Sequence, residues 1–107
     1  MKILFDQRTP APLRHSRAGC SVATAFENGW DKLQNGELIR VAETEGFYAM
    51  ITTDQNLKHQ QNLSHGKLAI LVLPTTSWPK MQKHLEKISA AVNSLKPGEY
   101  CELDFGN

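Results

Sequence analysis

Residues 68–73 read Leu-Ala-Ile-Leu-Val-Leu, a run of six consecutive apolar side chains. A strand with one face in water would alternate apolar and polar residues, whereas an unbroken run is typical of a strand covered on both faces. Parallel sheets have this property, because the helices that connect their strands pack on both sides. The run therefore predicts a central strand of a parallel sheet in an α/β domain.

Other segments of the chain have the length and composition of strands. These segments are residues 2–6, 21–25, 49–52 and 100–105. The first is a short apolar run that ends in a charge, and the last alternates apolar with polar residues, which is typical of an edge strand. Since helical patterns separate the segments, we expect a central, mostly parallel sheet of four or five strands flanked by helices.

The clearest helical pattern covers residues 35–46, where the apolar residues fall on one face. Asn35 is predicted as the N-cap of this helix, because an amide side chain can accept a hydrogen bond from the first turn. Gly46 is predicted to end it. Residues 26–33, just before the helix, are ambiguous between helix and loop.

A second long helix is predicted from Trp78 to Leu95, closed by Pro97 and Gly98. Its apolar stripe consists of Met81, Leu85, Ile88, Val92 and Leu95. Two uses of this face stay open, namely the core of the domain and the contact between two copies in a homodimer.

Two shorter helices are predicted, one from the positions of two prolines and one from a candidate N-cap residue. Pro10 and Pro12 suit the first turn of a helix that Gly19 ends. Asp54 suits the N-cap of a helix that runs to Leu63.

The composition is that of one globular domain over residues 1–107, with 40% hydrophobic and 21% charged residues. No stretch approaches the ~20 apolar residues that span a membrane, and the apolar run at the N-terminus stops too early for a signal peptide. We therefore expect a cytoplasmic protein without a membrane partner. In that compartment Cys20 and Cys101 are expected to be buried free thiols.

The formal net charge of +1 provides no global basic field that would indicate a nucleic-acid partner. Binding of this kind would need a local patch. The two candidate patches are Arg8, Arg14, His15 and Arg17, and Lys80, Lys83, His84 and Lys87. The second set has helical spacing, so the solvated face of a helix is its simpler interpretation.

Polar residues converge on one edge of the predicted sheet, the carboxyl end of its strands, where parallel α/β sheets bind ligands. Asp6 ends the first strand, Asp54 follows the strand at 49–52, and the N-terminus of the helix with Asn35 and Glu37 points to the same edge. Carboxylates gathered there repel each other without a cation, and Mg²⁺ or Mn²⁺ prefers such oxygen ligands. A metal held this way polarises a phosphodiester and lowers the pKa of an attacking water. The pattern predicts a hydrolytic nuclease with Asp6, Glu37 and Asp54 as its catalytic carboxylates.

Structural interpretations stay open for two of these acids. Asp54 is a good helix N-cap, and Glu37 is favourable in the first turn of a helix because it complements the helix dipole. A charge directly after Ile-Leu-Phe in a buried strand has no packing role, which favours a function for Asp6.

The same residues resemble a known family. Residues 3–7, Ile-Leu-Phe-Asp-Gln, are similar to the start of the compact PIN-like proteins found among VapC-type toxin components. Residues 35–39, Asn-Gly-Glu-Leu-Ile, and 51–57, Ile-Thr-Thr-Asp-Gln-Asn-Leu, resemble the second signature of that family, in which an acid opens a helix and Thr-x-Asp follows the next strand. Together with residues 60–63 and 78–79, the resemblance covers essentially the whole chain.

This resemblance implies a PIN-like three-layer fold, an acidic cluster that binds magnesium or manganese, and cleavage of single-stranded RNA. It also implies an antitoxin protein as a partner, in a toxin-antitoxin module. The implied metal ligands are Asp6, Asp54, Glu37 and Asn35. The candidate substrate-binding residues are Arg8, Thr52, Asn56 and Lys58.

The chain departs from the family at three positions. Asn35 stands where an acid usually opens the helix, and Glu37 lies two residues on as a substitute. Gln7 and Asn56 likewise replace acids. Amides still offer a neutral oxygen to a metal, but each change removes negative charge, so metal binding is expected to be weaker.

Two other functions compete with the nuclease. A binding module would keep the fold without the chemistry and act through a protein partner. A receiver-like phosphoacceptor domain also has aspartates after its first and third strands, but it requires paired acids at the first strand, where this chain has Asp6 followed by Gln7.

Overall fold

The computed structural model describes residues 2–10, 12–13, 21–55 and 67–106. The strands are β1 (Lys2–Phe5), β2 (Ser21–Thr24), β3 (Ala49–Thr52), β4 (Ala69–Val72) and β5 (Tyr100–Glu102). The helices are α1 (Asn35–Thr44), α2 (Trp78–Gln82) and α3 (Leu85–Ser94). Each segment predicted as a strand contains one.

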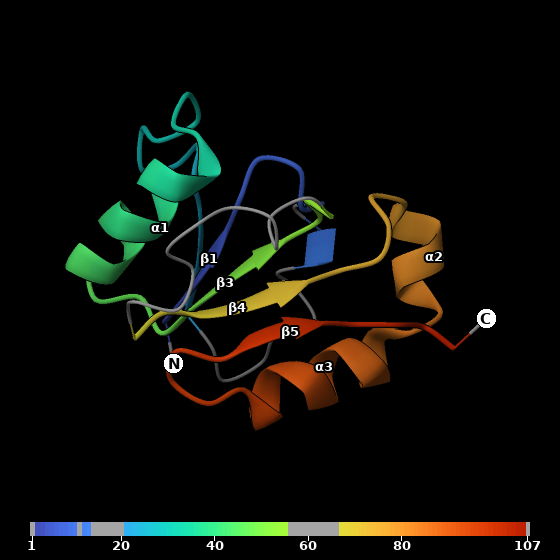
Figure 1. Ribbon diagram of the computed structural model, residues 1–107. Helices are drawn as coiled ribbons and strands as arrows, with labels where there is room; N and C mark the ends of the chain where they lie inside the picture. Colours follow the sequence, from blue (N-terminus) through green and yellow to red (C-terminus); the bar gives the residue numbers. More distant parts are fainter. Residues whose placement is uncertain (1, 11, 14–20, 56–66, 107) are drawn as a thin grey trace.

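The strands form one sheet in the order β2-β1-β3-β4-β5, and every neighbouring pair is parallel (Figure 1). The apolar run at 68–73 contains β4, which lies between β3 and β5 with all of its residues buried. The predictions of a central parallel strand and of an α/β sheet flanked by helices are confirmed. β5 lies at the edge as predicted, although its pairing ends at Glu102.

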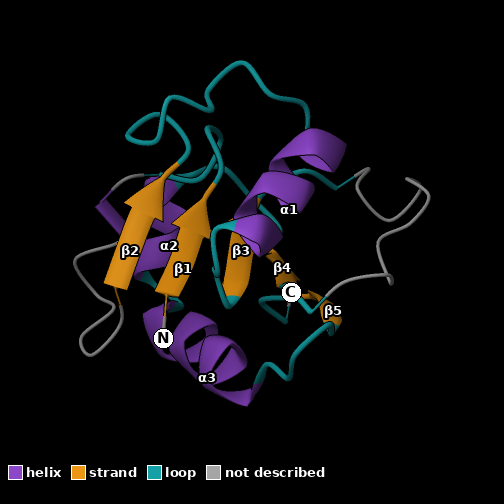
Figure 2. Cartoon of the chain, turned by 90° about the vertical axis from the view of Figure 1, so that its left-hand side faces the viewer, coloured by secondary structure: helices purple, strands orange, loops and turns teal. Residues whose placement is uncertain are grey.

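Helices cover both faces of the sheet, which produces three layers (Figure 2). Because side chains along a strand alternate between faces, Ile3 and Phe5 enter one core and Leu4 enters the other. On β3, Ile51 joins the first core and Met50 the second. The first core lies against α2 and α3, and the second lies against α1.

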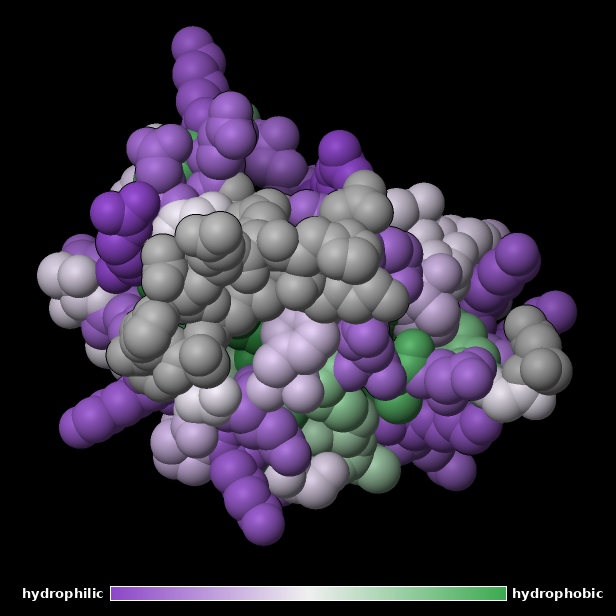
Figure 3. Space-filling model, viewed as in Figure 1, coloured by the Kyte–Doolittle hydropathy of each residue, from purple (hydrophilic) through white to green (hydrophobic). Residues whose placement is uncertain are grey.

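On the face shown in Figure 3, hydrophilic side chains occupy most of the periphery. Among the described residues Phe26, 71% exposed, is the only exposed large apolar side chain. Of the helices that the structure describes, none is long and apolar enough to cross a lipid bilayer.

The start of α1 differs from the prediction by one residue. Gln34, rather than Asn35, is the N-cap, and its side chain makes no capping hydrogen bond. The Gln34 carbonyl accepts the first bond of the helix, from the Leu38 N–H at 2.8 Å, which places Asn35 in the first turn. The predicted end is confirmed, because Gly46 follows the C-cap Glu45 with a φ of 81°, a conformation that favours glycine.

The prediction of one continuous helix from Trp78 to Leu95 is wrong. The chain forms α2 and α3, separated at Lys83 and His84, where His84 has a φ of −129° and a ψ of 26°. The break lays the His84 ring on Phe105, with the ring centroids 4.3 Å apart and the planes at 21°. This aromatic stacking stabilises the interruption. The apolar stripe packs into one core on both sides of the break.

Some predictions fall beyond the described residues. Most of the helix predicted over 54–63 lies there, and so does most of the helix predicted to end at Gly19, of which Pro12 and Leu13 form a short 3₁₀ turn. The individual residues outside the described ranges are Arg14, His15, Arg17, Cys20, Asn56 and Lys58. Cys101 is a free thiol, half-buried rather than fully buried.

Candidate functional site

Two of the predicted acids lie at one edge of the sheet. β1 and β3 are parallel neighbours with Phe5 opposite Ile51, so their carboxyl ends meet. Asp6 follows β1 directly, and Asp54 lies two residues after the end of β3. The Asp6 N–H continues the pairing by donating to the Ile51 carbonyl at 3.2 Å. The structure therefore places Asp6 and Asp54 together at the edge where ligands bind in parallel sheets.

The Asp6 side chain is buried, with 5% of its surface exposed. Its Oδ1 atom accepts hydrogen bonds from the Thr9 N–H at 3.1 Å and from the Thr9 hydroxyl at 2.8 Å. Its Oδ2 atom accepts a short hydrogen bond from the Thr52 hydroxyl. A buried carboxylate is tolerated when hydrogen bonds replace its hydration, so the two threonines explain how Asp6 can occupy this position.

The Thr52 hydroxyl connects the two acids. While it donates to Asp6, its oxygen accepts a hydrogen bond from the Asp54 N–H at 3.1 Å. On the other side of Asp6, the Thr9 hydroxyl also lies 2.9 Å from the Ile51 carbonyl. These bonds tie the loop after β1 to the end of β3, and they fix the relative positions of the Asp6 carboxylate and the Asp54 backbone.

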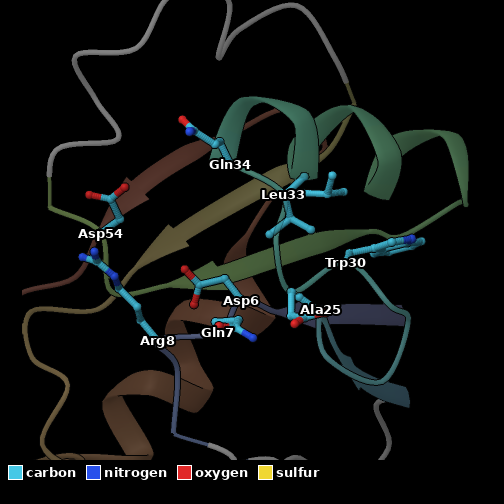
Figure 4. A pocket seen from close by; sticks show the side chains of 10 residues that line it. Asp6, Gln7, Arg8, Ala25, Trp30, Leu33, Gln34 and Asp54 are labelled. Carbon is cyan, nitrogen blue, oxygen red and sulfur yellow. The ribbon is translucent and has the colours of Figure 1, made fainter.

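A cavity of about 260 Å³ opens at this edge. Its polar lining consists of Asp6, Gln7, Arg8, Asp31, Gln34 and Asp54. Figure 4 shows the Arg8 guanidinium group pointing toward Asp54, with the Asp6 carboxylate beside them. The cavity thus combines carboxylates, amide oxygens and one guanidinium group, which are the groups that bind a divalent cation and a phosphate.

The remaining lining of the cavity is apolar. It consists of Ala25, Trp30, Leu33 and Leu38. Three of these residues come from the stretch between β2 and α1, and Leu38 comes from α1 itself. In Figure 4 Ala25, Leu33 and Trp30 lie on the opposite side from Asp54 and Arg8, and the Trp30 ring extends away from these two residues. One cavity therefore has a charged half and an apolar half.

The other predicted site residues are placed differently. Glu37 is exposed in the first turn of α1 and does not line the cavity. Asn35 begins that helix. Thr52 has no exposed surface, so its observed contacts are with the two acids rather than with the cavity. In the part of the chain that the structure describes, no three His, Cys, Asp or Glu side chains form a group that could hold a metal ion.

Sequence reasoning missed Thr9, Trp30 and Asp31. Thr9 lies three residues after Asp6, a spacing at which an Asp side chain often bonds to the backbone of a turn, so this contact had a usable signal. Trp30 and Asp31 lie in the stretch without a clear periodicity, where neither helical nor strand patterns indicate which side chains face the sheet.

The Tyr100 hydroxyl lies within the electrostatic field of the site. Burial raises the pKa of Tyr100 above its ordinary value of 10.0, and the carboxylates of Glu102 and Asp54 raise it further. Among the described residues, its buried oxygen has no hydrogen-bond partner. Tyr100 is thus a desolvated phenol near an acid of the cavity.

The lysines predicted as a basic stripe are exposed on α2, α3 and the turn between them. Lys80 and Lys83 extend from the surface, whereas the Lys87 Nζ donates to the Phe105 carbonyl at 2.9 Å. None of the three lines the cavity. Among the members of the two predicted basic patches that the structure describes, Arg8 alone lines the cavity with the acids.

Comparison of the chain with models of known protein families, with curated proteins and with solved structures found no match. The resemblance to PIN-like proteins accordingly rests on the sequence motifs quoted above.

Proposed function

We propose that this protein is a metal-dependent ribonuclease that hydrolyses phosphodiester bonds of single-stranded RNA, with Mg²⁺ or Mn²⁺ held by Asp6 and Asp54. The observation that carries the proposal is that these two acids, from the ends of neighbouring strands, line one cavity together with Arg8. Carboxylates that lie close together around a cavity repel each other, which destabilises the folded protein. A bound divalent metal offsets this repulsion.

The residues present fit a hydrated metal ion. A carboxylate has about four acceptor positions, and the hydrogen bonds from Thr9 and Thr52 use at most three on Asp6. One position on Oδ2 is left for a ligand. Magnesium is usually bound by one or two carboxylates, several waters and the phosphate of the substrate, so a site with Asp6 and Asp54 does not need a third acid.

The remaining residues of the polar half have complementary roles in this proposal. A bound metal would polarise the phosphodiester and lower the pKa of a water molecule. The Arg8 guanidinium group would bind a phosphate oxygen through paired N–H donors. Asp31 lines the cavity and Glu37 does not, so in this proposal Glu37 has no catalytic role and Asp31 faces the substrate without binding the metal.

Calorimetric titration with Mn²⁺ and Mg²⁺ tests the proposal. We expect binding by the wild type and loss of binding in Asp6→Asn and in Asp54→Asn. The control is Glu86→Gln, which removes an exposed carboxylate from α3 and should bind metal as the wild type does. Because Asp6→Asn also disturbs the bonds to Thr9 and Thr52, circular dichroism must show that each variant is folded.

The titration should be repeated in the presence of a single-stranded RNA, since the phosphate would complete the metal site, and gel electrophoresis should show whether the RNA is intact at the end of the titration. Absence of metal binding at millimolar concentration, both with and without this RNA, contradicts the proposal.

A second candidate function is a binding module without catalysis, and a specific observation favours it. Both oxygens of Asp6 already accept hydrogen bonds, so this acid has a structural role that does not require a metal. In that case Asp6→Asn would reduce stability while the wild type would bind no metal. The toxin role follows from the sequence resemblance and belongs to the ribonuclease, whereas a protein partner such as an antitoxin is compatible with either function.

A further inference from the structure

We propose that Arg8 makes metal binding depend on the substrate. Its positive charge weakens the binding of a divalent cation to the free protein, and a phosphate of the RNA relieves this repulsion. The inference rests on the proposed function, because it takes a divalent cation and an RNA phosphate as the ligands of the cavity. It assigns to Arg8 a second role, in which this residue couples the two binding steps.

The charges of the cavity are the first argument. Its charged lining consists of Asp6, Asp31, Asp54 and Arg8. Among the described residues, Arg8 is thus the only cation of the lining. A positive charge repels a divalent cation nearby, and a partly desolvated site screens this repulsion less than bulk water does. The charge of Arg8 should therefore lower the affinity of the carboxylates for a metal.

The direction of the Arg8 side chain is the second argument. Figure 4 shows its guanidinium group pointing toward Asp54, with the Asp6 carboxylate beside them. Arg8 is exposed, and among the described residues its side chain has no hydrogen-bond or ion-pair partner. Its N–H donors are therefore available to an anion that binds near the acids. A phosphate has several oxygens, so it can bind the guanidinium group with some of them and the metal with another.

The fixed backbone around Arg8 is the third argument. On one side the Asp6 N–H donates to the Ile51 carbonyl at 3.2 Å, and on the other the Thr9 N–H donates to the Asp6 carbonyl at 3.3 Å. This turn holds Arg8 two positions after a proposed metal ligand, so its charge stays near that ligand. Arg8 therefore acts on the metal in both situations. It repels the metal when no phosphate is bound, and it shares a phosphate with the metal when one is bound.

Thermodynamic linkage gives this arrangement a measurable consequence. If a phosphate raises the affinity for the metal by some factor, the metal raises the affinity for the phosphate by the same factor. Part of this coupling comes from the direct contact between metal and phosphate. The remaining part comes from Arg8, and a substitution that removes its charge should remove that part only.

Calorimetric titration with Mn²⁺ alone is the first measurement. We expect Arg8→Gln to bind Mn²⁺ about threefold more tightly than the wild type, the effect of one exposed charge. The matched control is Arg40→Gln, which removes the same charge from an exposed residue of α1 that does not line the cavity, and it should bind as the wild type does. Since the Arg8 side chain has no partner to lose among the described residues, Arg8→Gln should fold normally.

The same titration in the presence of uridine 5′-monophosphate is the second measurement. This nucleotide has a phosphate but no phosphodiester bond, so the proposed reaction cannot consume it. Uridine, which has no phosphate, is the control ligand, and titrations without protein correct for Mn²⁺ bound by the nucleotide itself. We expect the nucleotide to strengthen Mn²⁺ binding by the wild type at least about fivefold, by Arg8→Gln about half as much or less, and uridine to have no effect.

The outcomes distinguish this inference from the proposed function. Mn²⁺ binding that is no tighter in Arg8→Gln than in the wild type overturns the inference and leaves the ribonuclease in place. An equal effect of the nucleotide on the two proteins, or an equal effect of uridine and the nucleotide, overturns it as well. If the wild type binds no Mn²⁺ under any of these conditions, the proposed function fails together with the inference.

Discussion

The Thr52 hydroxyl donates a hydrogen bond to the Asp6 carboxylate. Both side chains are buried, and their hydrogen bond joins the end of β1 to the end of β3. The same hydroxyl accepts the N–H of Asp54. The position of both acids therefore depends on one threonine that has no contact with solvent. Thr52 is a positioning residue for the cavity.

Replacing Thr52 by Val keeps the shape of the side chain and removes the hydroxyl. Asp6 Oδ2 then loses its donor in a buried environment, which should lower the free energy of unfolding by about 2–3 kcal/mol. Thr52→Ser keeps the hydroxyl and should cost about 1 kcal/mol, the value of one buried methyl group. Urea unfolding measures both values, and equal losses in the two variants would show that the hydrogen bond contributes little.

The contact between Phe105 and His84 should be important for stability. Phe105 is 8% exposed and belongs to the core under α2 and α3, so Phe105→Ala should cost about 3 kcal/mol. Phe26→Ala removes the same atoms from a side chain that is 71% exposed, and it should change stability by less than about 0.5 kcal/mol. Thermal unfolding of the two variants provides the comparison, and similar melting temperatures would contradict the placement of Phe105.

Replacing each of the two tyrosines by Phe should have opposite effects. The Tyr48 hydroxyl donates to the Leu95 carbonyl at 2.7 Å, so Tyr48→Phe should cost about 1 kcal/mol. The Tyr100 oxygen is buried and has no partner among the described residues, so Tyr100→Phe should stabilise the protein by about 1 kcal/mol. Urea unfolding at pH 7 checks the signs, and a loss of stability in Tyr100→Phe would reveal a partner for its hydroxyl.

The raised pKa of Tyr100 also predicts a pH dependence. As the pH rises through 10.0, the unfolded chain loses the phenolic proton while the folded protein retains it, so the unfolded state binds fewer protons and stability falls. The contribution is fully present below pH 10 and is lost as the pH rises toward the folded-state pKa. Tyr100→Phe should remove this part of the decline, leaving the part that begins near pH 9.0 and belongs to Cys101, whose pKa is raised mainly by burial.

Gly46 should resist substitution for a reason that lies in its backbone. Its φ of 81° is in the left-handed region, and a Cβ at this position would meet no atom within 4 Å. Gly46→Ala should therefore cost about 1 kcal/mol through backbone strain alone. Gly46→Asn should cost less, because Asn tolerates this conformation better. If both variants were as stable as the wild type, α1 would have to end in another way.

The sheet could be predicted from the sequence because its signals are local. The apolar run at 68–73 and the short apolar segments at 2–6 and 49–52 each indicate a strand without reference to the rest of the chain. The break between α2 and α3 could not be predicted in this way. The spacing of the apolar stripe continues through it, and the partner that stabilises it, Phe105, lies beyond the helix at the far end of the described chain.

Of the residues in the candidate site, only those at the strand ends could be predicted from the sequence. Asp6 and Asp54 follow from topology, since parallel neighbouring strands end at one edge. The position of Trp30 depends on a loop that is tied to the sheet by long-range bonds, such as that from the Ala25 N–H to the Phe5 carbonyl at 2.8 Å. Sequence periodicity carries no information about such bonds, so the apolar residues that line the cavity could be identified only from the structure.

The bonds around Asp6 have a consequence for folding kinetics. Thr9 and Ile51 are 42 positions apart in the chain, and Asp6 and Thr52 are 46 positions apart. Every pair of neighbouring strands in the described sheet is parallel, so these strands cannot form an early hairpin that would hold these residues near each other. The cavity therefore comes into existence only when β1 docks on β3, a slow closure of a long chain segment. During refolding, ligand binding should return in the same kinetic phase as the sheet, and never before it.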